Sequence, residues 1–137
     1  MNVAAIVSAH RARILSLVPS ADVRLTGSAS IAGLSANDVD LVVLVDDVED
    51  AANALAGSYQ PLHREEWRDD WAAFREDDVD VVVTCEGTPG DAHHRLAWER
   101  LAHDPELVEE YRILKSSWDD YEVRKAAFFD RIAGDWR

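Results

Sequence analysis

Two valine-rich runs limit most strongly what this chain can fold into. Residues 38–45 and 79–85 contain the unbroken apolar stretches 41–45 and 81–83. Because a strand in the middle of a sheet is covered on both faces, its residues are apolar without alternation. We therefore expect both runs to be central strands of one sheet, lying next to each other.

The remaining residues predict short strands and several helices around this sheet. Further strands are expected at 23–26, 59–63 and 71–75, the last two pairing antiparallel around an acidic turn. Helices are expected at 2–17, 28–34, 48–57, 92–103, 105–117 and 119–133, with a loop at 87–90. The expected fold class is α+β, with a mixed β-sheet flanked by helices and a helical C-terminal third, in one domain of residues 1–137.

The composition is that of a soluble globular protein, with 47% hydrophobic and 30% charged residues. The formal net charge of −13 speaks against long DNA or RNA as a ligand and favours a small substrate that arrives with divalent cations. No apolar run approaches the roughly 18 residues of a membrane helix. Residues 1–17 form an amphipathic pattern rather than a signal peptide, so we expect a cytoplasmic protein. The sequence is compatible with both a monomer and an oligomer.

Acidic residues open both valine-rich strands. Asp38 and Asp40 are two residues apart, so on a strand their side chains share a face, while Val39 and Leu41 point into the core. Two neighbouring carboxylates repel each other unless a cation lies between them, and oxygen ligands of this kind suit Mg²⁺ or Mn²⁺. Asp80 opens the other strand and faces the same site if the two strands are neighbours. Asp38, Asp40 and Asp80 are therefore candidate metal ligands and catalytic residues, able to hold two ions about 3.5–4 Å apart.

A Gly27-Ser28 bend precedes the acidic strand and is a candidate phosphate site. The glycine lets the backbone approach a phosphate, while the serine hydroxyl and the amides that follow attract an anion. Lys115 is a second candidate phosphate contact, and Tyr111 is a candidate stacking partner for a nucleotide base. The alternative for this pair is a solvated helix face with an ordinary i,i+4 contact. Of the adjacent His93 and His94, we expect one to line the cleft and the other to face solvent.

These residues resemble the signature of the DNA polymerase β-like nucleotidyltransferase superfamily, which has a Gly-Ser after one strand, an Asp-x-Asp on the next and a third Asp on a later strand. Residues 26–34, TGSASIAGL, are similar to the GSTSVPGL stretch of GrpB-family proteins. The tail is similar to the same family at 95–101, 103–106, 111–115, Tyr121 and Lys125. The chain is thus identified as a member of the GrpB family, which implies a nucleotidyltransferase fold with helices closing one side. Where GrpB-like chains have Lys-Pro before the acidic strand and a histidine pattern on the late strand, this chain has Ala36-Asn37 and residues 78–80, DVD.

The acidic site and the resemblance together imply a metal-dependent nucleotidyltransferase that moves a nucleoside monophosphate from a nucleoside triphosphate to an unknown acceptor hydroxyl. Asp38 and Asp40 are expected to hold both ions, Asp80 to hold the ion that activates the acceptor, and Gly27-Ser28 to seat the β- and γ-phosphates. One alternative is a nucleotide-binding or antitoxin-like regulatory module on the same fold with little or no turnover. Another is an interaction protein without a ligand. The catalytic hypothesis requires that the three carboxylates converge with no lysine or arginine among them.

Overall fold

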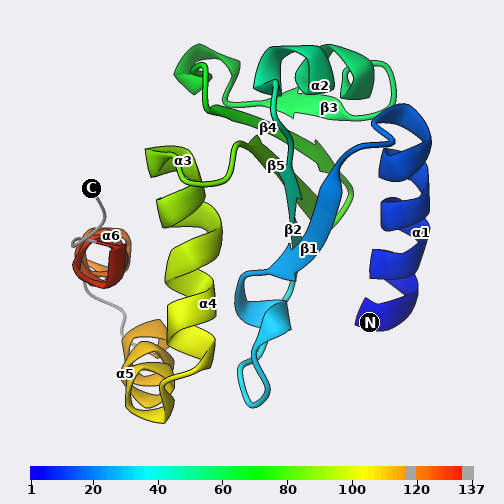
Figure 1. The fold of residues 1–137 in the computed structure, drawn as a ribbon. Helices are drawn as coiled ribbons and strands as arrows, with labels where there is room; N and C mark the ends of the chain where they lie inside the picture. Colours follow the sequence, from blue (N-terminus) through cyan, green and yellow to red (C-terminus); the bar gives the residue numbers. More distant parts are fainter. Residues whose placement is uncertain (117–119, 134–137) are drawn as a thin grey trace.

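A computed structural model describes residues 1–116 and 120–133, which form a five-stranded mixed sheet with helices on both faces (Figure 1). The strands are β1 (Asp22–Thr26), β2 (Val39–Leu44), β3 (Gln60–Leu62), β4 (Trp71–Glu76) and β5 (Val79–Thr84). They lie in the order β1-β2-β5-β4-β3, with β2 and β5 parallel and the other neighbours antiparallel. The two valine-rich strands are therefore neighbours in the middle of the sheet, as their sequence predicts.

One face of the sheet, here called the closed face, is covered by α1 (Val3–Leu17) and α2 (Val48–Leu55). Alternate residues of the central strands point toward these helices, because side chains on a strand alternate between its two faces. They are almost all aliphatic and fully buried: Val39, Leu41, Val43, Val81 and Val83 are each 0% exposed. Ile14 of α1, Leu55 of α2 and Phe74 of β4 complete this core.

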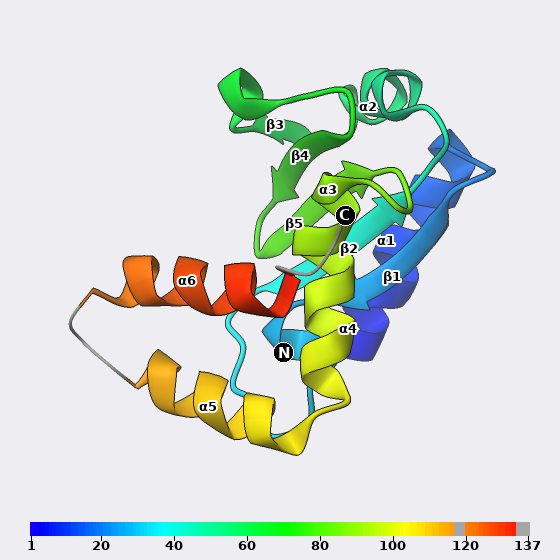
Figure 2. The same ribbon diagram turned by 60° about the vertical axis from the view of Figure 1, so that its left-hand side comes forward.

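The opposite face, here called the pocket face, is covered only in part. A continuous helical rod crosses it, made of α3 (Pro89–Asp91), the π-helical segment η3 (Ala92–Leu96) and α4 (Ala97–Ala102). Beyond the rod lie α5 (Pro105–Lys115) and α6 (Tyr121–Ala133), as Figure 2 shows. These helices share a second apolar cluster around Leu101, Tyr111, Leu114 and Phe128.

A chain of ion pairs runs along the helical rod and reaches β1 of the sheet. Arg95 donates from Nε and Nη2 to the two carboxylate oxygens of buried Asp91, at 2.6 and 2.8 Å, and from Nη1 to Glu99 at 2.9 Å. Glu99 in turn accepts a hydrogen bond from Arg24 of β1 at 3.2 Å. The pocket face is thus held by a chain of charges where the closed face is held by aliphatic packing.

The main differences in extent between the predicted and the observed elements concern three segments. The expected helix at 28–34 is only a 3₁₀ turn, η1 (Ser28–Ser30), because the backbone of Ile31 is already extended, with a φ of −116° and a ψ of 120°. The expected loop at 87–90 already contains the start of the helical rod, where Thr88 caps the backbone of Asp91 and Pro89 occupies the first turn. The last helix begins at Tyr121, and residue 119 of the expected range lies outside the described residues.

The predicted α+β class is confirmed, including its helical C-terminal part. Asp104 caps α5 through the amides of Glu106 and Leu107, also as predicted. In the described ranges 1–116 and 120–133, no helix is long and apolar enough to cross a membrane.

Candidate functional site

A single row of paired residues crosses the pocket face at the start of the central strands. Thr26 of β1 lies opposite Asp40 of β2, Asp40 lies beside Asp80 of β5, and Asp80 lies opposite Arg75 of β4. Residues paired in this way point to the same face of a sheet. Asp38 directly precedes β2 and lies two residues from Asp40, so it belongs to the same side. The register thus places the predicted acidic residues on neighbouring strands and adds a basic one.

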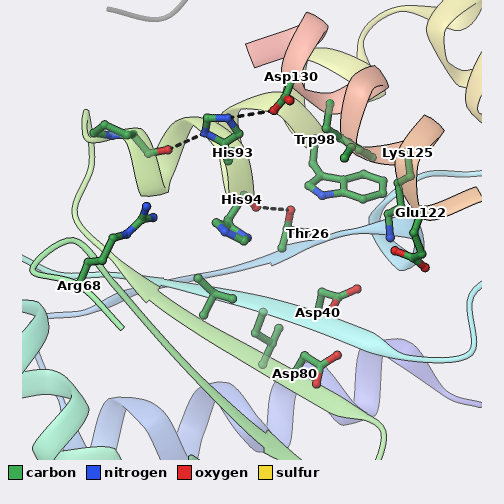
Figure 3. A pocket seen from close by; sticks show the side chains of 15 residues that line it. Thr26, Asp40, Arg68, Asp80, His93, His94, Trp98, Glu122, Lys125 and Asp130 are labelled. Carbon is green, nitrogen blue, oxygen red and sulfur yellow. Dashed lines mark hydrogen bonds and ion pairs between the residues drawn. The ribbon is translucent and has the colours of Figure 1, made fainter. Parts of the chain in front are cut away.

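A pocket of about 620 Å³ lies between this row and the helices that cover the pocket face. Figure 3 shows Thr26, Asp40 and Asp80 on its sheet side, beneath His94 and Trp98 of the helical rod. Charged side chains stand at its rim: Arg68, Glu122, Lys125 and Asp130. The pocket therefore combines an acidic floor, an aromatic roof and a mixed-charge rim.

The Gly27 bend is fixed by its contact with Asp40. Gly27 has a φ of 71°, which L side chains rarely adopt. A Cβ atom at this position would overlap the Asp40 carboxylate, so only glycine leaves room for that side chain. The sequence analysis assigned Gly27 to phosphate binding, and the structure adds a second reason for a glycine here.

Asp40 is a largely buried carboxylate without a partner. No residue within 1–116 or 120–133 donates a hydrogen bond or forms an ion pair to it. Burial, followed by the neighbouring charges of Asp80 and Asp38, raises the pKa of Asp40 to about 6, while Lys125 and Arg75 act against this shift. A carboxylate in this state favours either a proton or a cation.

Arg75 occupies the place where the sequence analysis expected a metal ion. Its Nη1 lies 2.5 Å from Asp80 Oδ1, and its Nη2 lies 3.3 Å from Asp38 Oδ1. Two of the three predicted metal ligands are therefore already paired with a guanidinium. Among the described residues, no group of three His, Cys, Asp or Glu side chains is arranged to hold a metal ion. As they stand, these residues do not fit the two-ion site that the sequence predicts.

The sequence analysis did not predict that Arg75 pairs with the acidic residues, because this contact depends on the register of β4 and β5. A tight turn at Asp77 and Asp78 joins β4 to β5, and this turn sets Arg75 opposite Asp80, five residues later. The sequence feature that indicates this contact is the short acidic turn at Asp77 and Asp78, between the strands β4 and β5. Recognising the hairpin that joins residues 71–75 to 79–85 would have placed the arginine beside the aspartate.

Lys115 and Ser28 come together, whereas Tyr111 does not take its predicted place. The Lys115 ammonium donates to Ser28 Oγ at 3.3 Å and to the Ser35 carbonyl at 2.8 Å. The Tyr111 ring is 1% exposed and lies against Trp98 and Phe128. The prediction that Tyr111 stacks on a base is therefore wrong, because packing between α4, α5 and α6 encloses the ring. Burial and the neighbouring Tyr121 hydroxyl raise the pKa of the Tyr111 hydroxyl.

Both adjacent histidines line the pocket, although the sequence analysis expected only one of them to do so. His93 is exposed at the pocket rim, where Nδ1 lies 3.0 Å from the Pro89 carbonyl and Nε2 lies 3.5 Å from Asp130. His94 points inward, with its ring 5.5 Å from that of Trp71. Burial lowers the pKa of His94 to about 4, so its imidazole is neutral at pH 7. Both belong to the π-helical segment, a distortion that often accompanies functional sites.

The five-stranded mixed sheet, with helices on both faces and a helical C-terminal part, defines an α+β protein. The chain belongs to the GrpB family, since the family model described as GrpB protein matches residues 2–134. It is 33% identical over 138 aligned positions to a UPF0157 protein of Deinococcus radiodurans, an alignment that covers 90% of this chain and 71% of the relative. The structure of the conserved protein GrpB from Enterococcus faecalis superimposes with a TM-score of 0.77 at 17% identity, covering 96% of this chain and 90% of that one. At that identity the second likeness shows the fold alone.

Proposed function

We propose that this chain binds a nucleoside triphosphate in the pocket above Asp40 and Asp80, with little or no turnover in the arrangement described here. The observation that carries the proposal is the Lys115 ammonium beside the Ser28 hydroxyl at the Gly27 bend. A cation, a hydroxyl and a glycine backbone at the end of a strand are groups that bind phosphate. Lys115 reaches this bend from 87 residues further along the chain, so the fold and not local sequence creates the combination.

The pocket beside this bend, whose lining includes the preceding residue Thr26, suits a planar heteroaromatic group. Trp98 and Phe129 line it and lie with their rings 4.6 Å apart. Exposed indole and phenyl faces stack on nucleotide bases, with about 1–3 kcal/mol for each stacked base. The neutral His94 imidazole adds one hydrogen-bond donor and one acceptor at pH 7. Trp98 thus takes the role that the sequence analysis gave to Tyr111.

Low turnover follows from the pairing of the acidic residues. Arg75 pairs with both Asp80 and Asp38, which leaves Asp40 as the carboxylate of the row that has no ion-pair partner within residues 1–116 and 120–133. Phosphoryl transfer depends on positioned groups that neutralise the charge of the reacting phosphates. Because two of the three aspartates are paired with the Arg75 guanidinium, they are not available to activate the reacting groups. We therefore expect the pocket to bind a nucleotide without efficient turnover.

Metal-dependent transfer is the second candidate, and Asp40 favours it. Its half-buried carboxylate, which has no ion-pair partner within residues 1–116 and 120–133, lies in register with Asp80, an arrangement that a cation would stabilise. In such a transfer the oxygen of an acceptor hydroxyl bonds to the α-phosphorus of the nucleotide and pyrophosphate leaves. Mg²⁺ or Mn²⁺ would supply charge neutralisation there, and Arg75 would have to leave Asp38 and Asp80 first.

Calorimetric titration of the four ribonucleoside triphosphates, with and without Mg²⁺, tests the binding proposal. We expect binding that Lys115→Met weakens about tenfold, the usual effect of losing a charged hydrogen bond. Arg112→Met is the matched control, because it removes the same charge from the exposed side of the same helix. Absence of binding to the wild-type protein contradicts the proposal.

A label-transfer assay separates the two candidates. The protein is incubated with α-labelled nucleoside triphosphates and a cell extract, and pyrophosphate release is followed in parallel. Binding without release supports the binding protein. Transfer that disappears in the double variant Asp38→Ala plus Asp40→Ala supports the second candidate instead.

A further inference from the structure

We infer that Arg75 is the built-in cation of the acidic row and that it excludes a divalent metal ion from Asp38 and Asp80 in the free protein. The inference goes beyond the proposed function, because it concerns the protein without nucleotide and is tested without one. It follows from the register of β4 and β5 and from the way the guanidinium is shared between two carboxylates.

The guanidinium spans the two carboxylates that a metal ion would need. One nitrogen, Nη1, contacts Asp80 and the other, Nη2, contacts Asp38, so a single planar group bridges β5 and the start of β2. A metal ion bound to the same Oδ1 atoms would stand within contact distance of a like charge. Since an arginine stays protonated at every pH at which proteins fold, this cation cannot be titrated away.

Asp40 cannot replace the lost ligands by itself. Its carboxylate is wedged against the Gly27 backbone, on the side of the row away from Arg75. One carboxylate is a poor site for a hard divalent ion, which needs several oxygen ligands. Removing the guanidinium would leave the carboxylates of Asp38, Asp40 and Asp80 free to bind a cation. The side chains of Asp38 and Asp80 are 43% and 26% exposed, so solvent ions can reach them.

Manganese titration followed by electron paramagnetic resonance tests this inference on the free protein. We expect Arg75→Met to bind Mn²⁺ about tenfold more tightly than the wild-type chain, since it frees two partly exposed ion-paired carboxylates. Adding Asp80→Asn to Arg75→Met should remove the gain. Arg68→Met is the matched control, because Arg68 also lines the pocket and loses the same charge, yet it pairs with Asp70.

Three outcomes overturn the inference: equal Mn²⁺ affinity in the wild type and Arg75→Met, an equal gain in Arg68→Met, or a gain that survives Asp80→Asn. Arg75→Lys is a control for misfolding of Arg75→Met. It keeps the positive charge but loses the planar guanidinium that contacts two carboxylates at once. We expect its Mn²⁺ affinity to lie between those of the wild type and Arg75→Met. Nucleotide binding is measured separately, so a failure here leaves the proposed function untouched.

Discussion

The two faces of the sheet are built from the same strands and are held to their helices in opposite ways. On the closed face, residues such as Leu41 and Val81 are fully buried against α1 and α2. On the pocket face, their immediate neighbours Asp40 and Asp80 line a pocket, and Glu99 of the covering helix pairs with Arg24 of β1 and with Arg95 of its own helix. Because side chains alternate between the two faces of a strand, the residues that stabilise the fold and the residues that line the pocket lie on opposite faces of the sheet.

This difference has an energetic consequence. Aliphatic burial stabilises a fold in proportion to the area removed from water, so the closed face supplies most of the stability. Buried charges contribute little net stability even when they are paired, and they are costly when a partner is lost. Substitutions on the two faces should therefore differ in the pH dependence of their effect on stability and in their effect on ligand binding.

The largest effect is expected where a buried ion pair on the pocket face is broken. Arg95→Met leaves the carboxylate of Asp91, which is 1% exposed, without its guanidinium. We expect the free energy of unfolding to fall by about 3–5 kcal/mol, measured by urea denaturation. Arg112→Met breaks a solvent-exposed pair and should leave the free energy of unfolding nearly unchanged. Similar losses in both variants would contradict the distinction between anchoring and surface pairs.

On the closed face, Leu55→Ala removes a side chain that is 0% exposed. The transfer and cavity terms predict a loss of about 2–5 kcal/mol. Because Leu55 lies across the sheet from the pocket, nucleotide affinity should stay within about twofold of the wild type at temperatures where the variant is folded. A marked loss of affinity in the folded variant would show that the two faces are coupled.

Asp40→Asn should make the protein more stable while weakening its function. The pKa of Asp40 is about 6 in the folded chain and 3.8 in the unfolded one, so the folded state binds the proton more tightly. That contribution to stability is present below about pH 4 and is lost as the pH rises through 6. The asparagine removes the cost of a buried charge, and we expect a gain of about 2 kcal/mol at pH 8 by urea denaturation. A variant that is less stable at pH 8 would show that the Asp40 carboxylate has a stabilising partner.

His94→Gln is expected to have the smallest effect, with the opposite dependence on pH. The pKa of His94 is lowered to about 4 in the folded chain, so its contribution is present above pH 6.5 and is lost as the pH falls toward 4. The glutamine should stabilise the protein by about 1 kcal/mol at pH 5 and have little effect at pH 8. Between pH 4 and 6, stability should therefore rise with pH in Asp40→Asn and fall with pH in His94→Gln. Parallel slopes in the two variants would contradict this assignment of the two groups.

The sequence was sufficient for features that depend on local pattern. Runs that are apolar on both faces identified β2 and β5 as adjacent central strands, and Asp104 with Pro105 identified the start of α5. Features that depend on register or on packing between helices were not predictable in the same way. Arg75 gained its partners through the hairpin, and Tyr111 is buried although Ile113 on the same helix is 59% exposed. An amphipathic pattern alone does not decide which face of α5 is covered when two further helices pack beside it.

Substitutions at positions 27 and 40 should be coupled during the evolution of this chain. The carboxylate of Asp40 fills the volume that a side chain at 27 would need. A relative that acquires even a methyl group at the first position must therefore shorten, redirect or discard the acid at the second. In an alignment of such relatives the two columns should change together, although thirteen positions separate them along the chain.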